Sequence, residues 1–288
     1  MAQQRATLQT ALLWQLLTSL PGKYDQDEKT QHGHTRRLDA LGLCIILLLY
    51  ICALRAGEDP WPNTPPLAVY VCQGMASAIS IYNLYVEILV LPRGTKASKD
   101  DFHVTYGPLG RWVYLTHQTI GALAIHSTVS LLALLFCRHL AYATYSATPL
   151  IGAAGVFVTV QYFNLVFPEV EHKKTCEVWA ERGVRFGFID SLRHILPILV
   201  VIFDVMAKRS ESFAAAIPSA PQLVLLTISY ACGFVCLTHM NYSITGFWPY
   251  SFMKTLDGRQ WLVFTLIQGS LLSLCGFSVC LLARFVTF

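Results

Sequence analysis

Four ionisable side chains interrupt an apolar stretch of the sequence that runs from 188 to 205. Asp190, Arg193 and His194 lie near its start, and Asp204 lies near its end. An aspartate and a histidine four positions apart share one face of a helix, where the carboxylate can orient the imidazole and stabilise its protonated form. Such an imidazole can act as a general acid or base, so His194, with Asp190 beside it, is the first candidate for proton transfer.

Polar residues near the ends of other apolar runs could join this chemistry. Glu87 offers a carboxylate, Thr116 a hydroxyl nucleophile and His117 a second imidazole. The remaining candidates of this kind are His239, Asn241 and Tyr242. The sequence holds no G-x-S-x-G, P-loop, G-x-G-x-x-G, H-E-x-x-H or D-D-x-x-D motif. Any chemistry must therefore come from isolated side chains that the fold brings together.

The composition places these residues in a membrane protein. Of the 288 residues, 54% are hydrophobic and only 13% are charged, whereas a soluble domain has about 25% charged residues. Helices and closed β-barrels are the two structures that can span a bilayer. The apolar runs do not alternate and are near helix length, so the sequence predicts an all-α, polytopic membrane helix bundle.

Apolar runs along the chain predict about seven transmembrane helices, because about 20 residues are needed to cross the hydrocarbon core. The runs are 40–56, 67–92, 111–137, 147–167, 188–206, 221–241 and 261–284. The run at 40–56 is the shortest, and whether it spans the bilayer fully stays open at this point.

The distribution of Lys and Arg predicts how the chain is oriented. With seven spans and a cytoplasmic N-terminus, the cytoplasmic segments hold 15 Lys and Arg residues and the opposite side holds 5. Cytoplasmic loops carry an excess of these residues. We therefore expect a cytoplasmic N-terminus and a lumenal C-terminus, which is opposite to the orientation of a G-protein-coupled receptor.

This orientation brings the candidate side chains to one leaflet of the membrane. Glu87 lies near the cytoplasmic end of the second span, and Thr116 and His194 lie near the cytoplasmic starts of the third and fifth. Ionisable residues within spans usually face a bundle interior or a cavity, so we expect one shared site. Asp204 lies about 15 Å further along its helix, in the other leaflet, and is expected to tolerate substitution by Asn with near-normal activity.

Some polar residues in the spans have structural explanations. His126 lies in the middle of a span and is expected to make a structural hydrogen bond. Arg193 is expected to extend toward water at the membrane surface. The nine cysteines show no paired C-x-x-C spacing, so they predict neither a zinc site nor a cofactor.

The chain is predicted to comprise a cytoplasmic N-terminal segment, 1–39, and a single transmembrane domain, 40–288. Leucines at helical spacing around Trp14 predict an interfacial helix in the first segment. The net charge of +4 resides mostly in cytoplasmic loops, which indicates membrane topology and not nucleic-acid binding. The expected partners are the bilayer and a lipophilic small molecule, in the endoplasmic reticulum or another internal membrane, and the oligomeric state stays open.

Segments between about 105 and 285 occur in the order and spacing of a known family. They are YGPLGRWVYLT (106–116), LVFP (165–168), DSLRHILPILVVIFD (190–204) and HMNYSITGFWPYSFM (239–253). Through them the chain resembles the androgen-induced and androgen-dependent TFPI-regulating protein family of multi-pass membrane proteins. The resemblance implies a threonine hydrolase of fatty acid esters of hydroxy fatty acids, with Thr116 of the W-x-x-L-T motif as nucleophile and His194 as its partner.

The chain departs from this family pattern in two places. One histidine, His239, stands where the family has a His-rich element before T-G-x-W, and an additional N-terminal span is present. In size and span count the chain is also similar to the membrane-bound terpene cyclases of fungal meroterpenoid pathways, of the type that closes a terpenoid epoxide in ascofuranone formation. In such an enzyme an acid protonates the substrate and aromatic side chains shield the cation.

Three functions therefore compete. A terpene cyclase is preferred, because the departures surround the expected pocket and Glu87 adds an acid beside Asp190 and His194. Its walls and the other substrate-binding candidates are Tyr82, Tyr85, Trp112, Tyr114, His117, Phe186, His239, Asn241 and Tyr242. The close alternative is the ester hydrolase, in which Thr116 attacks a carbonyl and His194 takes its proton. The third is a lipid-binding membrane protein without catalytic activity.

Overall fold

The computed structural model describes residues 58–61, 63–86, 114–181, 183, 185–246 and 248–286. The predicted interfacial helix, the apolar run 40–56 and the site candidates Glu87 and Trp112 lie outside these residues. Within them, every regular element is helical, which confirms the predicted all-α class.

The described residues form eight α-helices, a π-helical turn (η3) and a 3₁₀ turn (η4). Their bounds are Leu67–Tyr85 (α3), Leu115–Phe136 (α5), Arg138–Gln161 (α6), Tyr162–Val166 (η3), Val170–Glu181 (α7), Phe186–Met206 (α8), Ser210–Ala216 (α9), Ala220–Thr245 (α10), Ser251–Thr255 (η4) and Gly258–Val286 (α11).

Six stretches of this described chain are long and apolar enough to cross a membrane: α3, α5, α6 with η3, α8, α10 and α11. They coincide with six of the seven apolar runs, so the protein is a multi-pass membrane protein. The remaining span, predicted at 40–56 as the first in the chain, and the orientation of the two termini stay predictions.

Helix α6 begins at Arg138, well before the apolar run at 147–167 that predicts it. Its first turns carry hydroxyl side chains that donate back to carbonyls of the same helix. The Thr144 hydroxyl donates to the Ala141 carbonyl at 2.8 Å, and the Thr148 hydroxyl to the Thr144 carbonyl at 3.1 Å. Hydroxyls satisfied in this way can be buried in a span, which is why hydropathy alone places the start of this helix too late.

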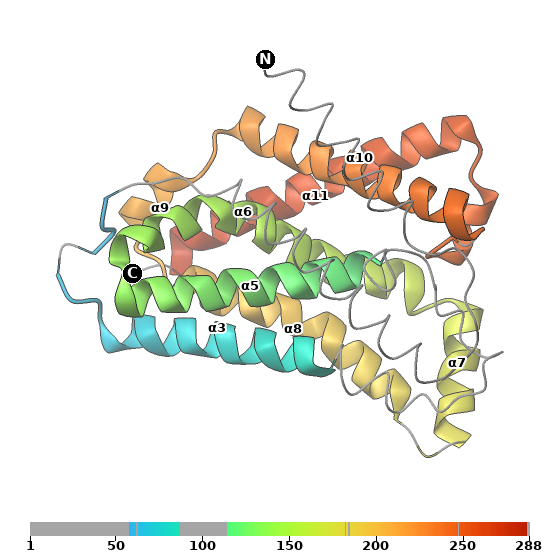
Figure 1. Cartoon of the computed structure of the whole chain (residues 1–288), viewed down its shortest axis with the longest axis horizontal. Helices are drawn as coiled ribbons and strands as arrows, with labels where there is room; N and C mark the ends of the chain where they lie inside the picture. Colours follow the sequence, from blue (N-terminus) through green and yellow to red (C-terminus); the bar gives the residue numbers. More distant parts are fainter. Residues whose placement is uncertain are drawn as a thin grey trace.

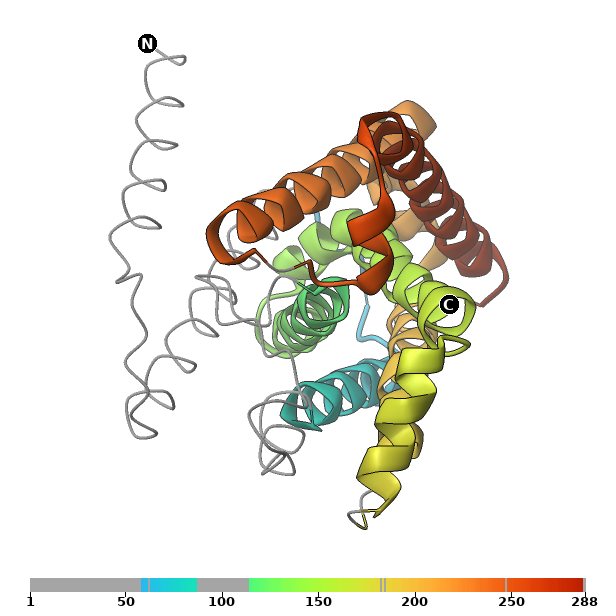
Figure 2. The same cartoon turned by 90° about the vertical axis from the view of Figure 1, so that its right-hand side faces the viewer.

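Four of the spans form a bundle, and the other two form a hairpin against it. α3 packs on α5 and α8, and α6 packs on α5, α8 and α11. α10 and α11 run antiparallel beside each other, with α11 lying on α6 (Figure 1, Figure 2). The shorter α7 stands at a steep angle at one end of the bundle (Figure 1).

Close approach to α6 depends on two of its glycines. A Cβ atom at Gly155 would lie 3.0 Å from a methyl group of Val201, and one at Gly152 would lie 3.1 Å from the methyl groups of Val279. Small residues allow helix backbones to approach in this way inside a membrane. The two glycines therefore allow α6 to lie between α8 and α11, in contact with both helices.

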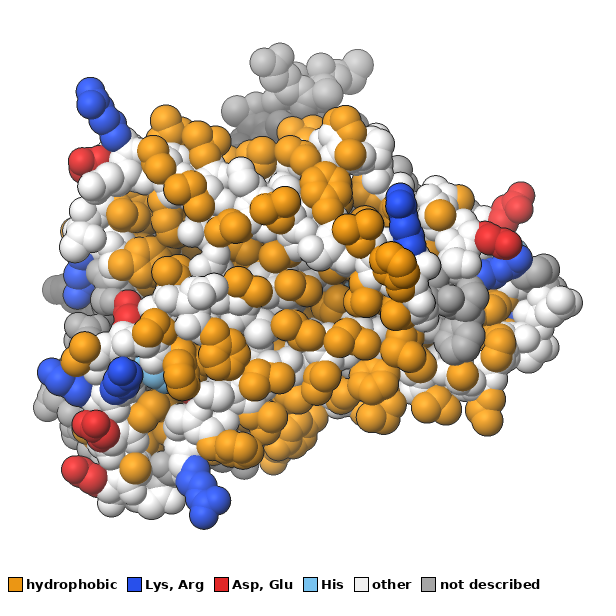
Figure 3. All heavy atoms as spheres, turned by 180° about the vertical axis from the view of Figure 1, so that it is seen from behind, with side chains coloured by type: hydrophobic (Ala, Val, Ile, Leu, Met, Phe, Trp, Pro, Cys, Tyr) orange, Lys and Arg blue, Asp and Glu red, His pale blue; other side chains and the backbone are white. Residues whose placement is uncertain are grey.

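The outer surface agrees with a bilayer-spanning body. Apolar side chains cover the flank shown in Figure 3, and most charged side chains gather at its two ends. Large apolar side chains such as Leu262, Leu274 and Phe285 of α11 are exposed on the outside of the hairpin. Such a surface is stable in lipid and would aggregate in water.

Candidate functional site

An apolar pocket lies between the α10–α11 hairpin and parts of α5, α6 and α8. It is a partly open pocket, and its empty space is about 740 Å³ when the solvent at its mouth is included. Its lining residues are Leu115, Thr116, Phe157, Val158, Gln161, Tyr162, Leu165, Val166, His194, Tyr230, Ala231, Phe234, Val235, Tyr250, Phe252, Met253, Phe264, Thr265, Gln268 and Leu272. These lining residues include no Lys, Arg, Asp or Glu, so this pocket of the described chain suits an uncharged lipophilic molecule.

Thr116 and His194 meet in the wall of this pocket. Thr116 is the second residue of α5, and His194 lies in the third turn of α8. The Thr116 Oγ1 and His194 Nε2 atoms are 3.2 Å apart, within hydrogen-bond distance. Both residues are buried. The structure therefore brings together the two residues that the shared-leaflet argument places at one depth.

The other nitrogen of the imidazole determines which way this hydrogen bond runs. His194 Nδ1 lies 2.7 Å from the backbone carbonyl oxygen of Asp190, which can only accept, so Nδ1 carries the proton. In the neutral ring Nε2 is then the acceptor, and the Thr116 hydroxyl donates to it. This is the arrangement that a hydroxyl nucleophile and its general base require.

The carboxylate of Asp190 has a different role from the one that the sequence predicts. Its Oδ1 atom lies 2.6 Å from Arg193 Nε but 3.8 Å from His194 Nδ1. Arg193 therefore turns toward Asp190 instead of extending to water. The histidine is oriented by the carbonyl of Asp190 and not by its carboxylate, because the ring reaches back along its own helix.

Pro197 shapes the segment of α8 that holds His194. A proline inside a helix has no N–H, so the carbonyl four residues earlier loses its helical partner. That carbonyl belongs to Arg193, and the Asn83 side chain of α3 donates to it at 3.0 Å. On the other side of α8, the Thr159 hydroxyl of α6 donates to the His194 carbonyl at 2.5 Å. The freed Arg193 carbonyl thus ties α8 to α3, and the bond from Thr159 ties α8 to α6.

A π-helical turn presents Tyr162 to the imidazole. The turn follows α6 directly, and such turns are frequent at functional sites because they change the direction of side chains. The rings of Tyr162 and His194 stack, with centroids 3.7 Å apart and planes inclined by 6°. The Tyr162 hydroxyl lies 3.3 Å from His172 Nε2 of α7. The plane of the catalytic candidate is therefore fixed from two sides, by this ring and by the Asp190 carbonyl.

Tyr250 brings a second hydroxyl to Thr116. It belongs to the loop that follows α10, which turns at Gly246 with a φ of 69°. The Tyr250 hydroxyl accepts from the Leu115 N–H at 3.2 Å and also interacts with the Thr116 side chain. Burial raises the pKa of Tyr250, so this hydroxyl stays protonated and can donate to an oxygen in the pocket.

Sequence reasoning missed the roles of Tyr162 and Tyr250. Tyr162 follows Gln161 at the end of an apolar run, and a glutamine in a span is a costly residue that could have pointed to this position. Tyr250 lies in the segment HMNYSITGFWPYSFM, which supports the family resemblance, but its chemistry depends on how the loop folds back onto α5.

Several predicted substrate contacts lie outside the pocket lining. Tyr82 and Tyr85 are exposed on the surface of α3. Phe186 stacks on Trp179 with ring centroids 5.7 Å apart, and it takes no part in the lining. The polar site of α8 faces α5 and α6 instead of the outer surface of α3, which separates Tyr82 and Tyr85 from it.

The candidates at the end of α10 are also displaced from the pocket. Val235 is the last residue of α10 in the lining, and the loop after the helix supplies the wall beyond it. Tyr242 stacks on Trp248 with centroids 4.3 Å apart, His239 packs edge-on against Trp261 at 4.4 Å, and Asn241 is buried.

Tyr114 and His117 border the pocket without lining it. The ring of Tyr114 meets that of Tyr250 edge-on at 5.8 Å and lies 5.9 Å from that of His117. Through these ring contacts Tyr114 packs against Tyr250 and His117 next to Thr116.

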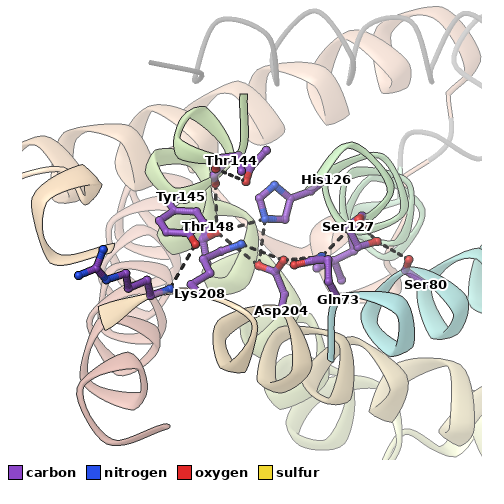
Figure 4. A network of polar contacts seen from close by, with 12 residues as sticks. Gln73, Ser80, His126, Ser127, Thr144, Tyr145, Thr148, Asp204 and Lys208 are labelled. Carbon is purple, nitrogen blue, oxygen red and sulfur yellow. Dashed lines mark hydrogen bonds and ion pairs between the residues drawn. The ribbon is translucent and has the colours of Figure 1, made fainter. Parts of the chain in front are cut away.

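A second polar cluster lies toward the other end of the bundle (Figure 4). At its centre, Asp204 receives hydrogen bonds from Lys208 at 3.1 Å, Gln73 at 3.1 Å and His126 at 3.0 Å. The Thr148 hydroxyl, whose one hydrogen is shared with the Thr144 carbonyl, lies 3.3 Å from the same carboxylate. The structural hydrogen bond predicted for His126 is confirmed, and the cluster joins α3, α5, α6 and α8 through one carboxylate.

A metal ion or a cysteine nucleophile finds little support in the described residues. They contain no group of three side chains placed to bind a metal. Cys176 Sγ lies 3.5 Å from His172 Nε2. Burial raises the pKa of this thiol, however, which keeps it in its weakly nucleophilic protonated form.

The fold and the site define a multi-pass helical membrane protein with a threonine–histidine pair in an apolar pocket. Comparisons with protein-family models, with curated proteins and with solved structures found no match. The geometry of the threonine–histidine site is therefore the basis for a functional proposal, and the two family resemblances stay predictions.

Proposed function

We propose that this protein is an integral membrane hydrolase of a lipophilic ester, with Thr116 as nucleophile and His194 as general base. The observation that carries the proposal is the 3.2 Å contact between Thr116 Oγ1 and His194 Nε2 in the wall of an apolar pocket. A nucleophile within hydrogen-bond reach of a base, with that base oriented by a third group, is the arrangement of covalent acyl transfer.

The reaction follows from the positions of these atoms. Thr116 Oγ1 attacks the ester carbonyl carbon while its proton passes to His194 Nε2. The tetrahedral intermediate breaks its bond to the alcohol oxygen, which receives the proton from His194 and leaves. Water then attacks the threonine ester with His194 again as base, and the products are one acid and one alcohol.

Tyr250 is placed to stabilise the negative oxygen of the tetrahedral intermediate. Its hydroxyl oxygen accepts from the Leu115 N–H, and because the Thr116 hydrogen goes to His194, the Tyr250 hydrogen is the one that points to Thr116 Oγ1. This hydrogen can turn to the negative oxygen that forms beside Thr116. Thr116 also lies in the first turn of α5, where the helix dipole favours negative charge.

Tyr250→Phe should lower kcat by about 10²-fold with little change in KM, since one oxyanion donor is worth about that much. Steady-state kinetics on the purified protein would measure this. Tyr145→Phe is the matched control, because it removes another buried tyrosine hydroxyl, one that accepts from the Trp61 indole N–H and does not line the pocket. Equal loss in both variants would mean that the effect is structural.

The proposal is tested by covalent labelling. A lipophilic fluorophosphonate should modify Thr116 of the purified protein, and peptide mapping by mass spectrometry should locate the label there. Prior addition of a slowly hydrolysed lipophilic ester should slow the labelling. A protein that hydrolyses no lipophilic ester and takes no label at Thr116 is not an enzyme of this class.

A terpene cyclase is the second candidate, and the aromatic side chains of the pocket favour it. Phe157, Tyr162, Tyr230, Phe234 and Phe264 are among the lining residues and could shield a cation. The lining of the described pocket offers no carboxylic acid to start such a reaction, and the ion pair with Arg193 keeps Asp190 as a carboxylate. Cyclisation of a prenyl epoxide that persists in Thr116→Val would establish this second function.

A further inference from the structure

Two glutamines face each other in the otherwise apolar pocket. Gln161 is the last residue of α6 and Gln268 lies on α11, and both are partly exposed in its lining. Gln161 Nε2 donates to Gln268 Oε1 at 2.8 Å. Within the described residues this is the one side-chain hydrogen bond that either amide makes.

The mutual bond leaves part of each amide for a ligand. A primary amide has one carbonyl oxygen and two N–H donors. With the bond as it stands, the Gln161 oxygen and the Gln268 amino group are available. Exchanging the roles of the two side chains would still offer the pocket one acceptor and one donor. In an apolar site such groups are costly to leave without partners, so a molecule that satisfies both is favoured.

A hydroxyl group fits this pair better than a charged group does. It can donate to the glutamine oxygen and accept from the amino group at the same time. A carboxylate has no donor, and none of the lining residues of the described pocket is a Lys or Arg that could neutralise it. The two amides therefore select an uncharged, hydroxylated molecule.

The pair also lies close to the reacting atoms in depth. Gln161 directly precedes Tyr162, whose ring stacks on His194. Neighbouring helical residues differ by about 1.5 Å along the axis, so Gln161 and Tyr162 leave the chain at nearly the same level, and both glutamines line the same pocket as His194. A hydroxyl bound there belongs near the ester and not at the far end of an acyl chain.

We propose that Gln161 and Gln268 form a recognition subsite for a free hydroxyl next to the ester of a neutral lipid. Its position relative to an ester rests on the proposed hydrolase function. The binding of the hydroxyl rests on the amide pair alone, and this difference allows the two proposals to be tested separately.

Two non-hydrolysable ethers provide the test: 1-hexadecyloxy-2-propanol and 1-hexadecyloxypropane, which differ in one hydroxyl. Their dissociation constants would be measured on the full-length protein in nanodiscs by displacement of a fluorescent lipid. The wild-type protein should bind the hydroxylated ether about tenfold more tightly or better, because a site that pairs with a hydroxyl rejects the analogue that lacks it. Equal binding of the two ethers by the wild-type protein overturns the subsite.

Substitution by methionine, which is similar in length and lacks the amide, should remove this preference. Gln161→Met and Gln268→Met should each bring the ratio of the two dissociation constants close to one. Gln118→Met is the matched control: the Gln118 oxygen accepts from the Tyr230 hydroxyl at 3.2 Å and Gln118 does not line the pocket, so the ratio should persist. A ratio unchanged in both Gln161→Met and Gln268→Met also overturns the proposal.

Two further measurements separate the outcomes. Thr116→Val should keep the preference for the hydroxylated ether and lose ester hydrolysis; hydrolysis that survives in this variant refutes the proposed function, while the binding ratio still decides the subsite. A third ether with a carboxylate in place of the hydroxyl should bind more weakly than the hydroxylated one. Tighter binding of the carboxylate would overturn the uncharged ligand class.

Discussion

Thr116→Val and His194→Ala should each lower kcat for ester hydrolysis by about 10³-fold or more. The first substitution removes the nucleophile and keeps the shape of the side chain. The second leaves the hydroxyl without a base, and general bases contribute about 10²–10⁴-fold. Because the two side chains share one hydrogen bond and act in one step, the double variant should be no slower than the slower single variant.

Asp190→Asn is the control for this pair. The His194 ring is held by the Asp190 backbone carbonyl at 2.7 Å, which the substitution leaves in place. The rate per folded molecule should therefore fall by less than about tenfold, far below the general-base effect. A Thr116→Val variant with nearly wild-type hydrolysis would contradict the dyad, as would effects of the two single substitutions that multiply in the double variant.

Asp204→Asn should lower the free energy of unfolding by about 3–5 kcal/mol, because it leaves a buried charge without its partner. Lys208 is 1% exposed, and its Nζ atom lies 3.1 Å from the Asp204 carboxylate. An asparagine cannot neutralise this ammonium group, and one of the oxygens that accept from Gln73 and His126 is lost. The sequence predicts near-normal activity for Asp204→Asn, and the buried ion pair adds the expectation that its stability falls.

Equilibrium unfolding in mixed detergent micelles would measure the loss. Replacing both charges, in Asp204→Asn with Lys208→Met, should restore most of the stability, since the unpaired charge is the main cause of the loss and the asparagine oxygen still accepts from a neighbouring donor. Glu211→Gln, which breaks the exposed pair with Arg209, should change little. The hydrolysis rate per folded molecule should stay near wild type in Asp204→Asn. An unfolding midpoint equal to that of the wild type would show that Lys208 finds another partner.

The sequence alone predicted the lengths of the apolar runs and the alternating direction of successive helices. The six described runs each formed a helix long enough to span a membrane. Alternating direction through the bilayer put Thr116 and His194 at one depth, and the structure places them in contact. The position of Pro197 alone indicates that the Arg193 carbonyl loses its helical partner, because the missing N–H is a property of proline itself. These features depend on local chemistry and on the length of one helix.

The partner of each polar group was decided by the tertiary structure. The spacing in the sequence allows the Asp190 carboxylate to pair with either Arg193 or His194. Which pair forms depends on the side-chain conformations in the folded protein. Lys208 follows the end of α8, where a sequence predicts a cation in water. It is buried because Asp204 lies one turn before it in the chain and the ring of Tyr145, from α6, lies 5.0 Å from its ammonium group.

The walls of the pocket also come from segments that are far apart in the chain. Gln161, Tyr230, Tyr250 and Gln268 converge because the α10–α11 hairpin lies against α6 and its loop folds back onto α5. The periodicity of apolar residues indicates which side of a helix is apolar, but it does not indicate which helix packs against that side. The sequence alone therefore determined a helical membrane bundle and predicted that Thr116 and His194 lie at one level of it. Helix packing decided which of those residues meet and what surrounds them, because contacts between helices depend on shape complementarity over the whole bundle.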